Sequence, residues 1–278
     1  MSTTEPAPRR LCLITGASAG IGAAFARIYA SHGYDLALTA RREDRLNAIA
    51  DDARLRHGVE TLIIPADLAD PAAPAAILAE IVSHGRTVSA LVNNAGYGLN
   101  GAFTRKDWTK QAAMLQVMLT APCELAHRVL PDMVGEGFGR IVNVASAAGL
   151  LPVWPGQTLY APIKAFLIKF SESLHLENLE TGVHVSALCP GFTYSEFHDV
   201  NGSRAALNRR LPAWMWLGAD EVAASGYEAA EANRPICVTG APNKAIAAVA
   251  KLIPDEWALA LMALMARRAP AAARPPAG

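Results

Sequence analysis

Tyr160 and Lys164 stand four positions apart in the sequence YAPIK, within an apolar stretch of the chain. On a helix this spacing places a phenol and an ammonium group on one face, a turn apart. A free phenol, with a pKa of about 10, exchanges protons poorly at neutral pH, but a nearby positive charge favours the phenolate and lowers that pKa. The pair therefore predicts a proton-transfer device. The alternative is a chance pairing with a lysine that reaches solvent.

A glycine-rich turn, TGASAGIG at 15–22, follows an apolar run and opens a helical pattern. Gly16, Gly20 and Gly22 lack the β-carbon that would keep a pyrophosphate away from the backbone, and a helix start offers N–H groups and the positive end of its dipole. Ser18 can add a hydroxyl donor. The spacing differs from G-x-G-x-x-G and from a P-loop. We predict a phosphate-binding turn; an ordinary helix start that contains glycine is the alternative.

The end of the second apolar run, LTARREDRL, indicates which dinucleotide would bind. An acid at this place would hold a ribose 2′-hydroxyl, whereas an arginine accommodates a 2′-phosphate. Here Ala40 is followed by Arg41 and Arg42, and cations at a helix N-terminus oppose the helix dipole, so helix stability alone does not explain them. NADP(H) is therefore predicted over NAD(H). Asp67 could accept from an adenine amino group or close an Asx-turn.

Apolar, strand-like runs alternate with helical patterns along most of the chain, without internal repeats. Strands that are apolar along their whole length indicate a parallel sheet covered by helices on both faces, and right-handed crossovers then give a Rossmann-like, doubly wound fold of about seven strands. Ligands of such sheets bind at the carboxyl ends of the strands, where the motifs above lie. The predicted strands are 11–15, 35–40, 59–66, 88–93, 140–146, 183–189 and 235–239, and the predicted helices are 20–32, 42–57, 71–84, 107–134, 158–180 and 219–232.

Composition limits the class of protein. The 278 residues are 52% hydrophobic and 18% charged, which suits one large domain, and the formal net charge of zero argues against nucleic acid as a partner. The widely spaced Cys12, Cys123, Cys189 and Cys237 favour a reduced, cytoplasmic setting without a disulfide framework or metal site. The N-terminus has no apolar signal region, and charged residues and a proline interrupt the apolar stretch 245–266, so no membrane span is expected.

The predicted organisation is one domain over 9–240, with a helical extension at 241–268. Residues 1–8 and 269–278 are rich in Pro, Ala and Arg and read as disordered tails. A lid is expected at 192–218. Its aromatic residues suggest an apolar substrate pocket, with core packing or a subunit contact as the alternative; they are Phe192, Tyr194, Phe197, Trp214 and Trp216, joined by Trp154 from the loop before Tyr160.

Taken together, these segments resemble the short-chain dehydrogenases/reductases. The matching stretches are TGASAGIG, the Asp67–Leu68 pair, NNAG at 93–96, NVASAAG with Ser146, YAPIK, and CPGFTYSEF with Pro190–Gly191. They occur in the family's order and approximate spacing, over residues 10 to about 240. The resemblance implies a single Rossmann-like domain, a nicotinamide cofactor, and interconversion of an alcohol with a ketone or aldehyde.

The resemblance also implies roles for individual residues. Tyr160 would be the acid/base, Lys164 its partner, and Ser146 the hydroxyl that orients the substrate oxygen. The expected cofactor-binding residues are Gly16, Ser18, Gly20, Ile21, Gly22, Arg41, Arg42, Asp67, Leu68, Asn94, Ala95, Gly96, Tyr160, Lys164, Pro190, Gly191, Thr193 and Ser195.

One departure concerns the long helical pattern at 107–134. Family members usually carry an asparagine there that helps hold a water linked to the lysine, but MLQVMLTAP has Met118 at that place. A thioether is a weak acceptor and cannot donate, and Gln116, two residues away, belongs to another helix face. Either backbone carbonyls and water serve the relay, or the chain is a catalytically impaired NADP(H)-binding regulatory protein. We favour a working enzyme.

The substrate expected from the resemblance is a moderately apolar alcohol or carbonyl compound. The helices at 107–134 and 158–180 are similar to those through which family members associate, so a homodimer or homotetramer is expected. A protein that binds a lipid surface, suggested by the C-terminal stretch, is a third and weaker hypothesis.

Overall fold

The structure is a computed structural model, and it describes residues 9–196 and 212–267. The described strands are β1 (Leu11–Thr15), β2 (Asp35–Thr39), β3 (Thr61–Ile63), β4 (Val88–Asn93), β5 (Gly139–Val144), β6 (Val183–Cys189) and β7 (Ile236–Val238). They form one sheet of seven strands in the order β3-β2-β1-β4-β5-β6-β7, and every pair is parallel. The predicted doubly wound parallel sheet is confirmed.

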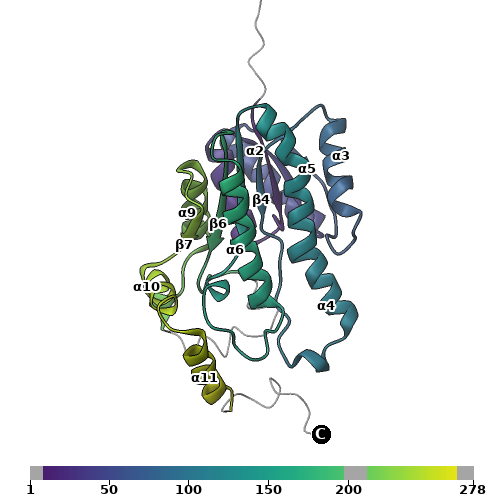
Figure 1. The fold of residues 1–278 in the computed structure, drawn as a ribbon. Helices are drawn as coiled ribbons and strands as arrows, with labels where there is room; N and C mark the ends of the chain where they lie inside the picture. Colours follow the sequence, from purple (N-terminus) through teal and green to yellow (C-terminus); the bar gives the residue numbers. More distant parts are fainter. Residues whose placement is uncertain (1–8, 197–211, 268–278) are drawn as a thin grey trace, which may run out of the picture.

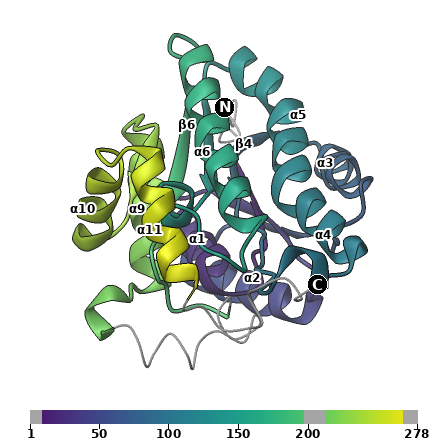
Figure 2. The same ribbon diagram turned by 60° about the horizontal axis from the view of Figure 1, so that its bottom comes forward.

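Helices cover both faces of this sheet (Figures 1 and 2). One face carries α3 (Ala73–Ser83), α4 (Trp108–Leu115), α5 (Ala121–Gly135) and α6 (Tyr160–Glu177), and the other carries α1 (Gly20–Ser31), α2 (Glu43–His57) and α9 (Ala219–Glu231). Two further helices, α10 (Ala241–Ala250) and α11 (Asp255–Ala266), extend from the α9 edge of the fold (Figure 1).

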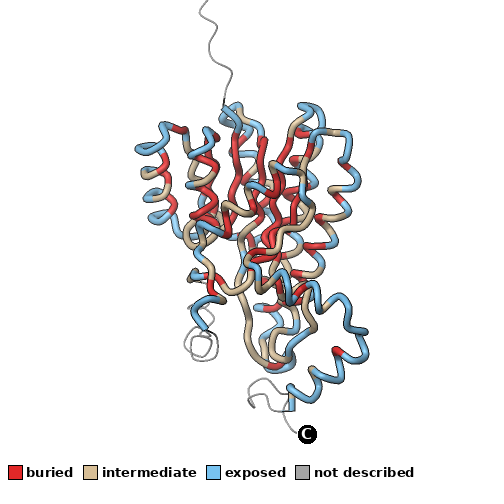
Figure 3. Tube along the Cα trace, turned by 90° about the vertical axis from the view of Figure 1, so that its left-hand side faces the viewer, coloured by how far each residue is buried: buried red, intermediate tan, exposed pale blue. Residues whose placement is uncertain are grey.

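The inner strands are mostly apolar because each side of the sheet is buried, as the red interior in Figure 3 shows. Successive side chains of a strand point to opposite faces. In β1, Leu11 and Leu13 pack under α3 to α6, whereas Cys12 and Ile14 pack under α1, α2 and α9. A strand that is apolar at consecutive positions therefore contributes side chains to two hydrophobic cores, one on each face of the sheet.

Two predicted elements differ in detail. The strand expected at 59–66 is only Thr61–Ile63 at the edge of the sheet. Its hydrogen bonds to the β2 side nevertheless continue past it, because the N–H groups of Ile64 and Ala66 donate to the Leu38 and Ala40 carbonyls at 3.0 and 3.1 Å. The helix expected at 107–134 begins at Trp108, where the Asp107 carboxylate caps it by accepting from the Thr109 N–H at 2.8 Å. It is also interrupted by a π-helical turn at Gln116–Thr120.

The C-terminal helices are the most exposed part of the described chain. In α11 the side chains of Trp257, Leu261 and Leu264 face solvent, and Ala258 is the one buried residue of this helix. Among the helices that the structure describes, none combines the length and the apolar character needed to cross a bilayer.

Candidate active site

The candidate residues gather at the carboxyl ends of the strands, where the strand order reverses. β1 lies between β2 and β4, so the chain leaves the ends of β1 and β4 in opposite directions and opens a crevice there. The glycine turn follows β1, Arg41 and Arg42 follow β2, Asn94 follows β4, and Ser146 follows β5. Residues that are far apart in the sequence therefore meet at one edge of the sheet.

The glycine turn is packed too closely for side chains. Gly16 and Gly20 have φ angles of 64° and 55°, a region that favours glycine. A β-carbon on Gly22 would lie 2.3 Å from the Gly16 carbonyl oxygen and 2.5 Å from Asn94 Nδ2. The Asn94 amide donates to the carbonyls of Thr15 and Gly16 at 3.0 and 3.1 Å. The turn is thus a bare backbone cradle that the loop after β4 holds in shape.

Thr15, the last residue of β1, locks the two strand ends together. Its hydroxyl donates to the Val92 carbonyl at 3.3 Å and accepts from the N–H groups of Asn94 and Ala95 at 2.9 and 3.1 Å. Sequence reasoning did not single out Thr15. The available signal was a hydroxyl residue at the end of an otherwise apolar strand.

Ser146, Tyr160 and Lys164 come together, as their spacing and the family resemblance predicted. Tyr160 begins α6, and its hydroxyl shares a hydrogen bond with the Ser146 side chain. The Ser146 hydroxyl also accepts from the Ala148 N–H at 3.1 Å. Lys164 is 4% exposed, its Nζ lies 5.7 Å from the centroid of the Tyr160 ring, and it donates to the Val144 carbonyl at 2.7 Å. The ammonium group is therefore beneath the phenol and out of solvent.

Local packing sets the start of α6. Pro162 lies in the first helical turn, where its missing N–H costs no internal hydrogen bond. Gly149, in the short helix at Ala147–Gly149, lets the loop after Ser146 approach this turn, because a β-carbon there would lie 2.6 Å from the Lys164 carbonyl carbon. The hydroxyl of Ser146 and the ring of Tyr160 are brought together by that contact.

Burial dominates the electrostatics of the pair. It raises the pKa of Tyr160, and the hydrogen bond from Ser146 opposes that shift. Burial also lowers the pKa of Lys164 from 10.5 to about 8, with Cys189 opposing. The prediction that the lysine charge lowers the pKa of the phenol is therefore wrong, because desolvation by burial dominates and raises it. The structure therefore holds the phenol in its protonated form.

A buried chain of side-chain amides and hydroxyls supports this arrangement. Asn93 donates to Asn143 at 2.9 Å, Asn143 donates to Ser171 at 2.8 Å, and Ser171 donates to the Leu167 carbonyl at 2.7 Å. These bonds join β4, β5 and α6 beneath the site. Sequence reasoning missed Asn143 and Ser171, although a polar residue inside the apolar run RIVNV was a signal for the first.

Met118 fills space instead of offering an amide. It is 1% exposed, and a β-carbon on Gly96 would lie 3.3 Å from its Cε. In the π-helical turn the Ala121 N–H donates to the Gln116 carbonyl. Pro122, four residues after Met118, has no N–H, so the Met118 carbonyl lacks its ordinary helical partner. Pro122 thus removes the i+4 hydrogen bond of an α-helix at the same turn where the side-chain amide is missing.

The basic residues after β2 are near the glycine turn. Arg42 donates to the Ser18 hydroxyl through Nη2 at 3.0 Å and Nε at 3.3 Å. Arg41 is exposed and acts electrostatically on Tyr97, whose pKa burial raises, Arg41 lowers and Asp67 raises. Asp67 accepts from the Ala69 N–H at 3.0 Å, so it closes an Asx-turn. These side chains border one side of the crevice.

Three of the residues predicted to bind the cofactor, Leu68, Ile21 and Ala95, have apolar side chains that pack against the cores of the fold. Leu68 is buried in the core under α3 to α6, where Ala95 packs against that core, and Ile21 packs against the core on the other face of the sheet. Their contribution to the crevice is its shape, because none of the three carries a polar side chain.

The segment after β6 turns back across the crevice. Pro190 accepts from the Ala147 N–H at 2.8 Å. Thr193 is 4% exposed and donates to the Gly191 carbonyl at 3.2 Å. A β-carbon on Gly191 would lie 2.1 Å from Asn243 Nδ2, so α10 packs against this segment at a residue that sequence reasoning did not identify.

The substrate side is described only in part. Tyr194 stacks on Trp216 with a centroid distance of 5.1 Å, the tilted ring of Phe192 lies 5.6 Å from it, and Trp216 is buried. Trp154 and Trp214 face solvent instead. The expected lid residue Phe197 and the rest of 197–211 lie outside the described residues, as do the tails 1–8 and 269–278. Of the described aromatics, Trp216 follows the core-packing alternative.

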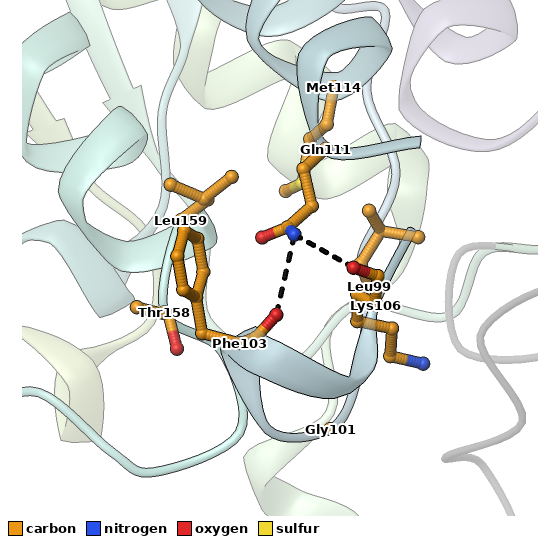
Figure 4. Close-up of a pocket in the computed structure, with 8 residues that line it drawn as sticks. All are labelled: Leu99, Gly101, Phe103, Lys106, Gln111, Met114, Thr158 and Leu159. Carbon is orange, nitrogen blue, oxygen red and sulfur yellow. Dashed lines mark hydrogen bonds between the residues drawn. The ribbon is translucent and has the colours of Figure 1, made fainter. Parts of the chain in front are cut away.

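A pocket opens where the loop after β4 meets the residues before Tyr160 (Figure 4). Gln111 is buried at its centre and donates to the carbonyls of Phe103 and Lys106 at 3.4 and 3.2 Å. The lining is mostly apolar and consists of Leu99, Gly101, Phe103, Lys106, Gln111, Met114, Thr158 and Leu159. It lies beside the start of α6, where a substrate side chain would need room.

Comparison with known proteins agrees with this geometry. Residues 10–205 match the short chain dehydrogenase family. Sulfoacetaldehyde reductase 2 of Chromohalobacter salexigens is 35% identical over 217 residues, which cover 77% of this chain and 85% of the reductase. A short-chain dehydrogenase from Sphingobium yanoikuyae in complex with NADPH is 31% identical, with a TM-score of 0.75 over 92% of this chain and 95% of that one.

The bulky-bulky ketone specific alcohol dehydrogenase from Comamonas testosteroni is also similar, at 28% identity with a TM-score of 0.72, over 92% of this chain and 93% of that chain. The chain therefore belongs to the short chain dehydrogenase family and is an oxidoreductase that acts on CH–OH or C=O groups.

Proposed function

We propose that this protein is an NADP(H)-dependent oxidoreductase that interconverts an alcohol and a ketone or aldehyde, with Tyr160 as the acid/base. The observation that carries the proposal is the hydrogen-bonded pair of Ser146 and Tyr160 above the buried Lys164. Three polar groups that are costly to bury converge at the carboxyl edge of the sheet, and fold stability does not explain them.

The crevice fits a dinucleotide phosphate. The cradle formed by Gly16, Gly20 and Gly22 leaves backbone N–H groups at the start of α1, and a β-carbon on Gly22 would disturb it. Arg42 and the Ser18 hydroxyl would receive the 2′-phosphate, with Arg41 beside them. The structures of the Sphingobium dehydrogenase and of L-sorbose reductase from Gluconobacter frateurii, both with NADPH, support this cofactor.

The chain's own residues would hold the substrate oxygen and move its proton. A bound nicotinamide supplies or accepts the hydride at the substrate carbon. Ser146 orients the oxygen, and Tyr160 donates a proton to it in reduction or accepts one in oxidation. Because burial raises the pKa of Tyr160, the protonated form that reduction needs is the resting form. Lys164 stabilises the phenolate that remains after proton donation.

Proton resupply would pass through the Met118 backbone. Its carbonyl lacks the i+4 partner of an α-helix because Pro122 has no N–H, and its second lone pair would accept from a water near α6. This favours a working enzyme over a catalytically impaired NADP(H)-binding regulatory protein, since the missing side-chain amide is not the only polar group available at this turn.

We place the substrate among moderately apolar carbonyl compounds. The pocket of Figure 4 is mostly apolar, and Lys106 is its only charged lining residue. The names of the relatives refer to substrates as different as sulfoacetaldehyde and bulky ketones, so membership of the family does not by itself indicate how large the substrate is.

We also propose the organisation and setting of the protein. It would be a cytoplasmic homodimer or homotetramer with one catalytic domain at 9–240, a lid at about 192–218 and a helical extension at 241–268. The four cysteines are free, and this supports a reduced setting.

The test compares wild type with Tyr160→Phe. Binding of NADPH, followed by its fluorescence, should be unchanged, while NADPH consumption over a broad panel of ketones and aldehydes should fall at least about 100-fold. Tyr227→Phe, on the α9 face, is the matched control and should keep full turnover. Binding of NADPH by wild type without any turnover that depends on Tyr160 would favour the regulatory alternative.

A further inference from the structure

Glu196 binds two arginines, Arg42 and Arg45, beside the glycine turn. Its carboxylate forms an ion pair with Arg42 at 2.9 Å and a second, shorter one with Arg45. These contacts lower the pKa of the Glu196 carboxyl, with Arg45 as the larger influence. Arg42 keeps its other nitrogens on the Ser18 hydroxyl. A carboxylate from the segment after β6 thus completes a small anion site built by α2 and the glycine turn.

The neighbouring residue closes the groove at a second point. A β-carbon on Gly20 would lie 2.9 Å from the Ser195 Cβ, so Ser195 packs directly on the glycine whose bare backbone would face a pyrophosphate. Ser195 and Glu196 are consecutive residues that contact two different surfaces, and a dinucleotide needs both of these surfaces.

We propose that Glu196 is an internal anion that competes with the 2′-phosphate of the cofactor for Arg42 and Arg45, and so sets both the affinity for NADP(H) and its margin over NAD(H). This inference rests on the proposed function, because it assumes that the crevice takes a nicotinamide dinucleotide. Carboxylate and phosphate oxygens accept from the same in-plane N–H groups at the edge of a guanidinium. Both cannot bind Arg42 in the same way at once.

The competition has a defined consequence. When a 2′-phosphate binds, the ion pairs of Glu196 with Arg42 and Arg45 break and new ion pairs with the phosphate form. The net binding free energy is therefore smaller than it would be if the two arginines had no carboxylate partner. The three side chains are 40–45% exposed, and exposed pairs are weak, so the handicap should be modest, about threefold to tenfold in affinity. A ligand without a 2′-phosphate has nothing to exchange at Arg42 and gains less when the carboxylate is removed.

The test uses Glu196→Gln, with Glu180→Gln as a matched control at the exposed loop before β6. Adenosine 2′-phosphate and adenosine 5′-phosphate serve as probes in calorimetry or competition binding, followed by NADPH and NADH. Glu196→Gln should tighten adenosine 2′-phosphate and NADPH about threefold to tenfold, and the NADPH/NADH affinity ratio should rise. Glu180→Gln should match wild type for all four ligands.

Salt provides a second readout. In wild type, salt weakens both the Glu196–arginine ion pairs that the ligand breaks and the phosphate–arginine ion pairs that it forms, so the two effects partly cancel. In Glu196→Gln only the phosphate–arginine ion pairs are weakened. The affinity of the variant for adenosine 2′-phosphate should therefore fall more steeply between low and physiological ionic strength.

The outcomes separate the two proposals. Equal or weaker binding of adenosine 2′-phosphate by Glu196→Gln, in a protein that binds NADPH, would overturn the competition while leaving the proposed function intact. Wild type that binds neither NADPH nor NADH would overturn the proposed function itself.

Discussion

Replacing Lys164 with methionine should reveal what the buried ammonium group costs the fold. The pKa of this lysine is lowered from 10.5 to about 8 by burial. The unfolded chain therefore binds more protons than the folded one between these values, and the lysine's destabilising contribution shrinks as pH rises through this window. Methionine has a similar length and no charge to bury, so its contribution does not change with pH.

The size of the effect follows from the shift. At pH 7 both states are charged, and keeping the folded lysine protonated costs about 3 kcal/mol. At pH 9 the folded lysine is largely neutral, and the cost falls to about 2 kcal/mol. The unfolding free energy of Lys164→Met minus that of wild type should therefore decrease by about 1 kcal/mol between pH 7 and pH 9.

The assay is urea unfolding without cofactor, under reducing conditions, at pH 7, 8 and 9. Burial raises the pKa of Cys123 to about 11 and of Cys189 to about 12, so these thiols remove stability as pH rises, but they are present in both proteins and largely cancel. Lys169→Met is the control, because the Lys169 side chain is 79% exposed and pairs with Glu172. Its difference from wild type should not vary with pH. A Lys164→Met difference that stays constant or grows with pH would refute the argument.

Two further predictions concern neighbouring positions. Gly22→Ala should abolish NADPH binding and destabilise the protein, since the new β-carbon would lie 2.3 Å from the Gly16 carbonyl oxygen. The control is Gly135→Ala, whose new β-carbon would have no packing neighbour within 4 Å. It should be neutral or stabilising by up to about 1 kcal/mol in unfolding assays. Met118→Asn should cost about 1–3 kcal/mol of stability yet raise kcat or leave it level, because the amide joins a relay that the backbone carbonyl already serves. Met133→Asn, an equally buried methionine far from the site, should cost similar stability without any gain in kcat, and a marked loss of kcat in Met118→Asn alone would show that the thioether is an adapted part of the site.

Much of the fold was predictable because its signals are local. Runs such as LCLIT and VSALVN are mostly apolar without a polar–apolar alternation, so they predict strands buried on both faces, and both are strands in the structure. Less regular segments were predicted less well. The edge strand β3 is shorter than its apolar run, and a π-helical turn at Gln116–Thr120 interrupts the long helical pattern just before Pro122.

The amino-acid sequence by itself determined the order of strands and helices and the placing of Ser146, Tyr160 and Lys164 after or beside strand ends, because these depend on periodicity and on spacing within a single element. Only the tertiary structure decided how Thr15 and Asn143 tie neighbouring strands, and how Glu196 reaches Arg42. It also decided the direction of the Tyr160 pKa shift. The desolvation of a group depends on every atom packed around it, and those atoms come from segments that are distant in the sequence. A local sequence pattern therefore cannot predict the pKa shift that desolvation causes.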